Sequence, residues 1–402
     1  MSVRERSKKF TSSITHRILA MEFLSEFIFI YPFYGIMFGQ RGAVSAAGIG
    51  VLLTTLQITT VVAEVPTGII ADKFSKKWVL LAAKLMKALA FLSWLLMPSF
   101  IGYFIGFILW GIAEALNSGA FQAYLYESLS ADNKSKFGPL YARVNSMTAF
   151  AVLAAFGGSF IIGPRYNLLL VLSVLACLAA MYFAATLPAG ERIVAEEKPR
   201  ILAGAVKHIY GTVALRELLM GAIIVGCLAN VLVEYMAFYY TQSGVSLKTL
   251  PLILAVGNII GILLYWHMSK LEVFAKKYKL ALLVGTGVVF AVSFSFGTFG
   301  VVLGYLVMVR VARFATVHYE STMQHLSQDA TRATIGSIYS FVAKLLAAGL
   351  FMSIGFFAQN NIIIRPVRYA VLGTIGAFAL SQILLSRNIK LRKNSGKTTV
   401  SI

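Results

Sequence analysis

Long apolar stretches recur along the whole chain and are separated by short polar segments. Each stretch has about the 20 residues that an α-helix needs to cross the hydrocarbon core of a bilayer. Because lipid offers no hydrogen-bond partners to the backbone, apolar segments of this length predict helices. The pattern predicts twelve spans, at residues 18–39, 46–70, 78–97, 102–127, 138–162, 166–187, 218–241, 249–268, 279–296, 299–322, 333–357 and 367–386.

The composition agrees with this pattern. Of the 402 residues, 58% are hydrophobic and only 13% are charged, whereas soluble proteins carry about 25% charged residues. The mean hydropathy is +0.78. Such a chain has too few charges to cover a surface that faces water, so we expect an all-α, multi-pass membrane protein. We expect it to lie in a bacterial-type plasma membrane.

The basic residues cluster in alternate loops between the predicted spans. With the N-terminus inside, 25 Lys and Arg residues fall on the inner side and 5 on the outer side. Basic residues accumulate in cytoplasmic loops of membrane proteins, so this bias predicts that both termini are cytoplasmic. The same clustering, without a continuous basic face, argues against a nucleic-acid partner despite the formal net charge of +20.

The chain divides near its middle into two halves of similar pattern. The motif Tyr-Glu-Ser ends the fourth predicted span at residues 126–128 and recurs at the end of the tenth, at residues 319–321. Two parallel repeats of this kind are found in secondary transporters. The pattern therefore predicts an N-terminal six-helix bundle, a charged cytoplasmic linker and a C-terminal six-helix bundle, at residues 1–190, 191–217 and 218–402.

The loop between the second and third spans carries a recognisable motif, Gly68-Ile69-Ile70-Ala71-Asp72-Lys73-Phe74-Ser75-Lys76-Lys77. It resembles the signature of the major facilitator superfamily, Gly-x-x-x-Asp-Arg/Lys-x-Gly-Arg/Lys-Arg/Lys, at five of its six specified positions; Ser75 replaces a glycine. Other segments, such as 64–68 and 332–334, are similar to its twelve-span branch of drug/proton antiporters. The resemblance implies alternating access, in which two six-helix bundles rock about a central site lined by spans one, four, seven and ten.

Several residues near the predicted cytoplasmic ends of the spans are candidates for a conformational gate. We expect Gly68 to let two helices approach closely and Glu127 to pair with Arg143. The full set of predicted gate residues is Gly68, Asp72, Lys73, Lys76, Lys77, Glu127, Arg143, Glu320 and Arg332.

Carboxylates inside the spans are candidates for proton coupling, because a charge at the centre of a bilayer costs at least about 2.5–3.5 kcal/mol and is usually functional. Glu22 and Glu26 lie one helical turn apart, and like charges at that spacing repel each other. Repulsion favours uptake of a proton by one of the two carboxylates. We predict that Glu26, Glu234 and Glu22 exchange protons. The nearby Lys84 and Lys87 are expected to snorkel or to form ion pairs.

Basic residues near mid-depth suggest the charge of the substrate. Arg310 and Arg313 could clamp a carboxylate or phosphate, or could neutralise Glu26 or Glu114. The middle layer holds more cationic than anionic groups, which favours a substrate with an anionic group or a zwitterion. The predicted substrate-binding residues are Glu114, Arg310, Arg313, Lys344, Tyr31, Asn230 and Tyr235.

Together these features predict a secondary transporter that exports a small amphipathic molecule in exchange for protons. The export signature expected in the fifth span is incomplete, so two alternatives stay open: uptake or exchange of an organic anion, and a sensor or lipid scramblase that does not transport solutes. No phosphate-binding loop or metal-ligand spacing is found. We therefore expect no enzymatic activity, no metal and no cofactor, with the proton gradient as energy source. The expected partners are the small-molecule substrate and membrane lipid, and the expected state is a monomer.

Overall fold

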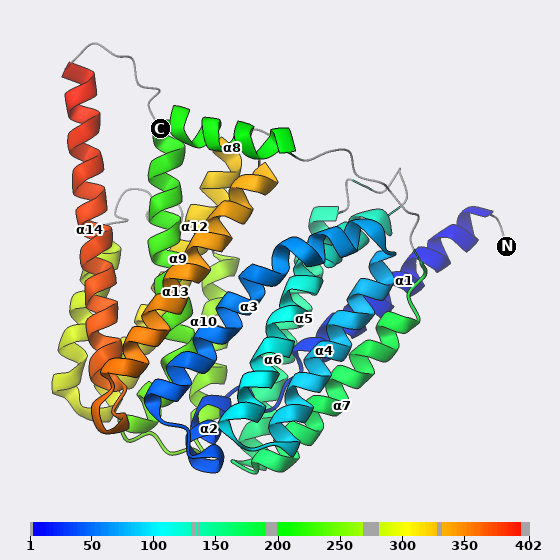
Figure 1. The fold of residues 1–402 in the computed structure, drawn as a ribbon, viewed down its shortest axis with the longest axis horizontal. Coiled ribbons are helices and arrows are strands. Elements are labelled where there is room, and N and C mark those ends of the chain that lie inside the picture. Colours follow the sequence, from blue (N-terminus) through cyan, green and yellow to red (C-terminus); the bar gives the residue numbers. More distant parts are fainter. Residues whose placement is uncertain are drawn as a thin grey trace. The chain divides into compact units, whose positions relative to one another are not determined.

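The computed structural model describes residues 3–129, 134, 137–189, 199–267, 281–327 and 332–394. Every regular element within these ranges is a helix, which confirms the all-α prediction for the described part of the chain (Figure 1). The long helices are α1 (Val3–Glu26), α3 (Ala46–Lys73), α4 (Lys76–Leu96), α5 (Phe100–Glu127), α6 (Phe137–Ile162), α7 (Tyr166–Ala185), α9 (Val213–Gln242), α12 (Gly297–Leu326), α13 (Arg332–Phe357) and α14 (Ile364–Asn394). Shorter elements are α2 (Tyr34–Gly42), α8 (Pro199–Gly211), α10 (Leu250–Trp266), a helix at residues 281–292, η2 (Ser293–Phe296) and η3 (Gln359–Asn361).

Eight helical segments in the described ranges are long and apolar enough to cross a membrane. One of them, Ala281–Met323, covers most of two predicted spans. The other predicted spans fall on α1, α2, α10 and α14, so the number twelve and the orientation of the termini stay predictions.

The chain forms two compact units. Unit 1 comprises Met1–Ala195 with Ser246–Ile259, and unit 2 comprises Glu196–Val245 with Ile260–Ile402. The residues described in unit 1 include α1 to α7, and those in unit 2 include α8, α9 and α12 to α14. Part of the predicted linker, residues 191–198, lies outside the described residues, as does residue 190.

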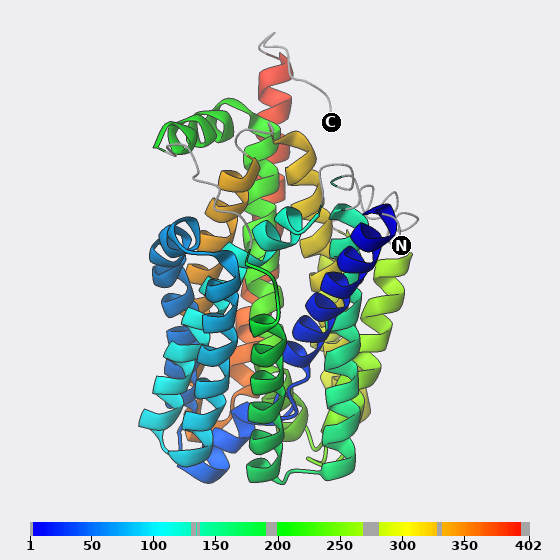
Figure 2. The same cartoon turned by 90° about the vertical axis from the view of Figure 1, so that its right-hand side faces the viewer.

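The first predicted span, residues 18–39, is not one helix, which corrects the sequence-based prediction. Helix α1 ends at Glu26 and α2 begins at Tyr34, and the chain between them is not helical (Figure 2). Pro32 explains part of the break, because proline has no N–H to donate and keeps the residue before it out of helical conformation. Two serines satisfy the released backbone groups: Ser159 Oγ donates to Phe29 O at 2.7 Å, and Ile30 N donates to Ser173 Oγ at 3.2 Å.

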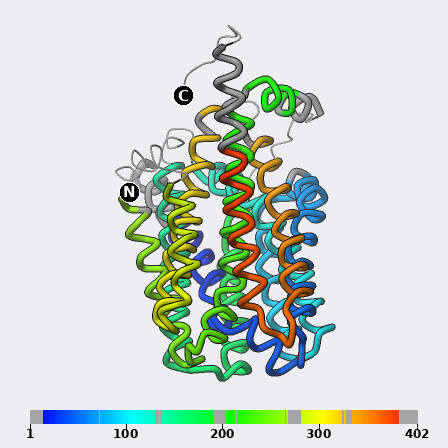
Figure 3. Tube along the Cα trace, turned by 90° about the vertical axis from the view of Figure 1, so that its left-hand side faces the viewer, coloured from blue at the N-terminus to red at the C-terminus, as the bar shows by residue number. Residues whose placement is uncertain are grey.

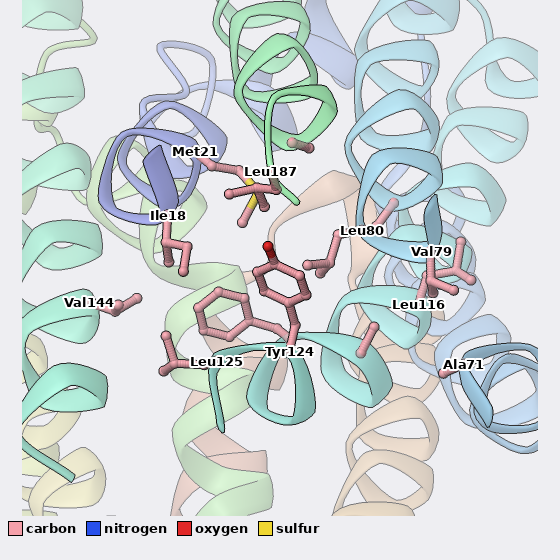
Figure 4. Close-up of a cluster of buried hydrophobic side chains, with 14 of the residues drawn as sticks. Ile18, Met21, Ala71, Val79, Leu80, Leu116, Tyr124, Leu125, Val144 and Leu187 are labelled. Atoms are coloured by element: carbon pink, nitrogen blue, oxygen red, sulfur yellow. The ribbon is translucent and has the colours of Figure 1, made fainter. Parts of the chain in front are cut away.

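Unit 1 has a core where α1, α4, α5 and the end of α7 meet. Figure 4 shows Tyr124 of α5 in the middle of this cluster, with Leu80 and Leu187 beside it. The ring is buried, and its hydroxyl donates to Pro188 O at 3.1 Å. Burial of a tyrosine ring with a satisfied hydroxyl contributes hydrophobic stabilisation without an unpaired polar atom.

Unit 2 has an aromatic core between α9 and α12. Tyr235, Tyr239 and Tyr305 are buried there, and the rings of Tyr239 and Tyr305 lie 4.2 Å apart. Tyr305 Oη donates to Leu232 O at 2.6 Å, which ties α12 to α9. Helix α14 runs along α9 on another side (Figure 3), while α8 crosses near its end (Figure 2). These contacts fix the helices that carry the polar residues of unit 2.

Candidate functional site

Two ion pairs join α1 to α4 inside unit 1. Glu22 Oε1 lies 2.7 Å from Lys84 Nζ, and Glu26 Oε1 lies 2.7 Å from Lys87 Nζ. The acids are four residues apart on α1 and the lysines three residues apart on α4, so both pairs project from matching helical faces. The lysines thus form ion pairs, one of the two outcomes expected from the sequence, and each carboxylate has its own cation.

The Glu22–Lys84 pair is shielded from solvent, and its lysine is fully hydrogen-bonded. Lys84 Nζ donates to Glu22 Oε1, to Ser25 Oγ at 3.1 Å and to Asn117 Oδ1 at 3.0 Å. An ammonium group has three N–H donors, so Lys84 is fully satisfied. The side chains of Lys84 and Glu22 are only 3% and 8% exposed. This geometry leaves Glu22 little contact with solvent.

In the Glu26–Lys87 pair the carboxylate is partly exposed to solvent. The Glu26 side chain is 30% exposed, whereas Lys87 is 5% exposed. Glu26 Oε2 accepts a hydrogen bond from Tyr31 Oη at 3.3 Å, and Lys87 Nζ lies 5.7 Å from the centroid of the same tyrosine ring. Glu26 is therefore in contact with solvent while it faces a buried cation.

A line of side chains extends this pair to a second carboxylate. The Tyr31 ring stacks on Trp110 with 5.8 Å between centroids, and Trp110 Nε1 donates to Glu114 Oε1 at 3.0 Å. Glu114 is exposed. We call Glu26, Lys87, Tyr31, Trp110 and Glu114 the Glu26 network. The structure thus brings together three of the predicted site residues of unit 1: Glu26, Tyr31 and Glu114.

Unit 2 contains a separate polar cavity of about 160 Å³ between α9, α12 and α13. Of the predicted site residues, Asn230, Arg313, Glu320 and Lys344 line it. Its formal charge is positive, because two cationic side chains face one carboxylate. The sequence placed Glu320 in a gate, whereas the structure places it beside the predicted substrate-binding residues.

The carboxylate of Glu320 has a second neighbour that sequence reasoning missed. Tyr339 of α13 lines the same cavity and makes a side-chain hydrogen bond to Glu320. The backbone at Gly226 makes room for it, since a Cβ there would lie 2.4 Å from Tyr339 Oη. Gly226 is visible in the sequence of α9, but the sequence does not show that Tyr339 packs against it.

Other predicted residues of unit 2 lie apart from the cavity lining. The Arg310 side chain packs against Gly261, where a Cβ would lie 2.7 Å from Arg310 Nη1. Tyr235 is buried, and its hydroxyl donates to Phe351 O at 3.0 Å. Glu234 is half-buried on α9 and does not line this cavity. An arginine clamp of Arg310 with Arg313 is therefore not formed at the cavity, where Arg313 is joined by Lys344 instead.

A family model described as Major Facilitator Superfamily matches residues 18–355. The chain belongs to the major facilitator superfamily. This confirms the resemblance seen in the signature loop and identifies the protein as a multi-pass membrane transporter, not an enzyme.

A curated relative shares part of the sequence. A Na(+), Li(+), K(+)/H(+) antiporter of Planococcus maritimus is 27% identical over an alignment of 183 residues that covers 43% of this chain and 42% of the relative. The chain thus aligns with less than half of that antiporter's length.

Solved structures support the superfamily fold. A mutant form of the nucleoside transporter NupG superimposes with a TM-score of 0.74 at 15% identity, covering 93% of this chain and 99% of that one. A bacterial homologue of the human lysosomal transporter Spinster gives 0.73 at 14% identity, with 96% and 98% covered. A D-xylose-proton symporter gives 0.72 at 13% identity, with 94% and 97% covered. Identities this low speak for the fold alone.

In the superfamily signature loop, Lys76 Nζ lies 2.7 Å from Glu127 Oε1. Glu127 thus pairs across α4 and α5 with a signature lysine, and the expected partner Arg143 is exposed on α6. The close helix approach expected at Gly68 is not found, because a Cβ there would meet no atom of the described residues within 4 Å. Lys73 is exposed, and Lys77 Nζ lies 5.4 Å from the Trp78 ring centroid.

The side chains of Asp72 and Arg332 lie outside the described part of the structure.

Proposed function

We propose that this superfamily member is a proton-coupled antiporter that exports a small amphipathic molecule across the plasma membrane by alternating access. The observation that carries the proposal is the Glu26–Lys87 pair, in which a partly exposed carboxylate faces a buried ammonium group 2.7 Å away. The antiporter named among the relatives supports exchange with protons.

The pair links proton binding to conformation through charge. A proton on Glu26 removes the negative charge that balances Lys87, and a buried ion left without its partner costs about 3–5 kcal/mol. The protonated state is therefore stable only when Lys87 finds another partner or when the surroundings of α1 and α4 rearrange. The non-helical segment 27–33 directly after Glu26 offers a place where α1 can move without α2.

The driving force is adequate for export. Moving one elementary charge through a potential of 100 mV supplies about 2.3 kcal/mol. One decade of concentration corresponds to about 1.4 kcal/mol, so a single coupled charge supports a gradient of roughly fifty-fold.

Flux measurements in reconstituted vesicles test this proposal. With an imposed pH gradient, a panel of amphipathic compounds and monovalent cations identifies a transported solute; cations are included because of the antiporter relative. We expect Glu26→Gln to abolish pH-driven flux while exchange of labelled for unlabelled solute continues. Glu114→Gln is measured in parallel because it removes the other carboxylate charge of the Glu26 network; as a predicted substrate-binding residue, Glu114 is a comparison and not a neutral control. If Glu26→Gln and Glu234→Gln both leave pH-driven flux unchanged, the proton assignment is wrong.

A second candidate function is uptake or exchange of an organic anion, and the cavity of unit 2 favours it. Arg313 and Lys344 provide two cationic groups, and Glu320 can accept a hydrogen bond from a donor on the same solute. Ligand pockets usually measure about 300–1,000 Å³, so the cavity of about 160 Å³ fits the charged head of a solute. A carboxylate or phosphate is the matching chemistry.

Paired variants distinguish this candidate. Arg313→Gln and Lys344→Gln should each weaken solute affinity, whereas Arg310→Gln, which removes an arginine outside the cavity lining, should not. If all three variants bind the solute with the same affinity, the cavity is not part of the binding site. Absence of any gradient-dependent solute movement in the unmodified protein would favour the sensor or scramblase alternative.

A further inference from the structure

The end of unit 1 opposite the signature loop has an open cavity lined by two arginines. Arg41 lies in the last turn of α2, and Arg165 directly precedes α7. Together with Tyr166, Asn167 and Leu168 they line a cavity of about 380 Å³. We call these five residues the arginine notch.

The positive charge of the arginine notch is not balanced by this part of the chain. The sequence has no Asp or Glu between residues 27 and 63 or between residues 133 and 190. Arg41 Nη1 is buried and has no hydrogen-bond partner among the described residues. A buried donor on a charged group is costly when it is unsatisfied, so the notch has the character of a site that lacks its anion.

The start of α7 adds to this character. The first N–H groups of a helix have no partner within the helix and carry partial positive charge. Helix α7 begins at Tyr166, and the Arg165 side chain makes no capping hydrogen bond there. Tyr166 Oη donates to Gln40 Oε1, and its ring lies 6.2 Å from that of Phe33. These contacts hold the start of α7 against α2, so the donors are already in place.

An apolar stripe leaves the arginine notch along α7. Its members are exposed and follow one another at spacings of three or four residues, which places them on one face of the helix: Leu168, Val171, Leu175, Leu178 and Tyr182. A free inorganic anion would use only the notch, whereas a lipid would use the notch for its headgroup and the stripe for an acyl chain.

We propose that the arginine notch binds the phosphate of an anionic phospholipid, with one acyl chain along the stripe on α7. Arginine is suited to this ligand because its planar guanidinium can donate two parallel hydrogen bonds to a phosphate. The bound lipid connects Arg41 of α2 with the start of α7 and so stabilises the second half of the broken first span. In the predicted orientation this lipid belongs to the outer leaflet.

Lipid binding to the full-length protein in detergent tests the proposal. Phosphatidylglycerol should raise the thermal unfolding midpoint and remain bound in native mass spectrometry, and phosphatidylcholine should do neither to the same degree. Arg41→Gln and Arg165→Gln should each lower the number of bound phosphatidylglycerol molecules by about one and remove most of the midpoint shift. Lys248→Gln and Arg365→Gln are matched controls, since they remove basic residues from other predicted outer loops, and both should behave like the unmodified protein.

Three outcomes overturn the proposal. If phosphatidylcholine stabilises as well as phosphatidylglycerol, or if the double variant Arg41→Gln/Arg165→Gln keeps the bound lipid, the notch is not a phospholipid site. If inorganic phosphate alone reproduces the whole midpoint shift, the ligand is a free anion. Arg165 is exposed, so Arg165→Gln should fold normally. Leu175→Asn adds an independent measurement, because it should weaken long-chain but not short-chain phosphatidylglycerol.

Discussion

Two ion pairs lie one helical turn apart between the same two helices, yet their surroundings differ. In the Glu22–Lys84 pair both side chains are buried and every N–H of the ammonium has an acceptor. In the Glu26–Lys87 pair the ammonium is buried, but the carboxylate is 30% exposed and also accepts a hydrogen bond from Tyr31. The same chemical groups at the same 2.7 Å distance therefore differ in their exposure to solvent.

The difference in solvent exposure points to a stabilising role for one ion pair and a coupling role for the other. A buried, fully hydrogen-bonded pair resists the loss of either partner, because the remaining charge has no alternative. In the Glu26–Lys87 pair the carboxylate is partly exposed, which is the property that the proposed proton coupling needs. We therefore assign a structural role to Glu22–Lys84 and a coupling role to Glu26–Lys87, and the predictions below test this assignment.

The largest expected effect is on stability and comes from Lys84→Met. This change leaves Glu22 buried without its cation, and breaking a buried pair in this way costs about 3–5 kcal/mol. Thermal and denaturant unfolding of the purified protein in detergent would measure the loss. The double variant Glu22→Gln/Lys84→Met removes both charges and should regain most of the stability. A double variant as unstable as Lys84→Met would contradict the structural role.

Lys87→Met should have a smaller effect on stability and a larger one on transport. Glu26 keeps its contact with solvent and with Tyr31, so the loss should be about 1–3 kcal/mol, typical of an acceptor that loses one partner. Because the proposed coupling runs through this pair, removal of the ammonium group should change how the transport rate depends on pH. Vesicle flux measured over a pH series checks this, with Lys84→Met as comparison. An unchanged pH profile would argue against coupling at this pair.

The smallest expected effect comes from Tyr31→Phe. It removes only the 3.3 Å hydrogen bond to Glu26 and keeps the ring that stacks on Trp110. One hydrogen bond contributes about 0.5–1.5 kcal/mol to stability, and this long one should lie at the lower end. Unfolding midpoints measure the stability, and the pH profile of the flux should change less than it does for Lys87→Met. A shift larger than that of Lys87→Met would make the tyrosine, not the lysine, the main partner of Glu26.

The sequence was informative where a property depends on local pattern. Apolar stretches predicted the helices, the signature loop with Asp72 indicated the superfamily, and each intramembrane carboxylate was recognised as costly. The spacings of Glu22 and Glu26 and of Lys84 and Lys87 were also visible. These are features of single helices, and the periodicity of one helix is enough to read them.

Properties that depend on contacts between helices could not be predicted in the same way. The sequence predicted that Glu22 and Glu26 repel each other, because it could not show which helix packs against α1. The break after Glu26 depends on Ser159 and Ser173, which come from helices more than 100 residues away in the chain. A serine in an apolar span gives no sign of the backbone group that it will satisfy.

The non-helical segment between α1 and α2 divides the first predicted span into two helical parts. A displacement at Glu26 need not be transmitted to Arg41 at the end of α2, because no continuous helical backbone joins the two. The segment between them is instead hydrogen-bonded to serine hydroxyls of α6 and α7. Spectroscopic reporters on α1 and on α2 would then follow different events in one transport cycle. A fluorinated tyrosine at position 34 and a second label near Gly39 would report on α2 separately from a label on α1.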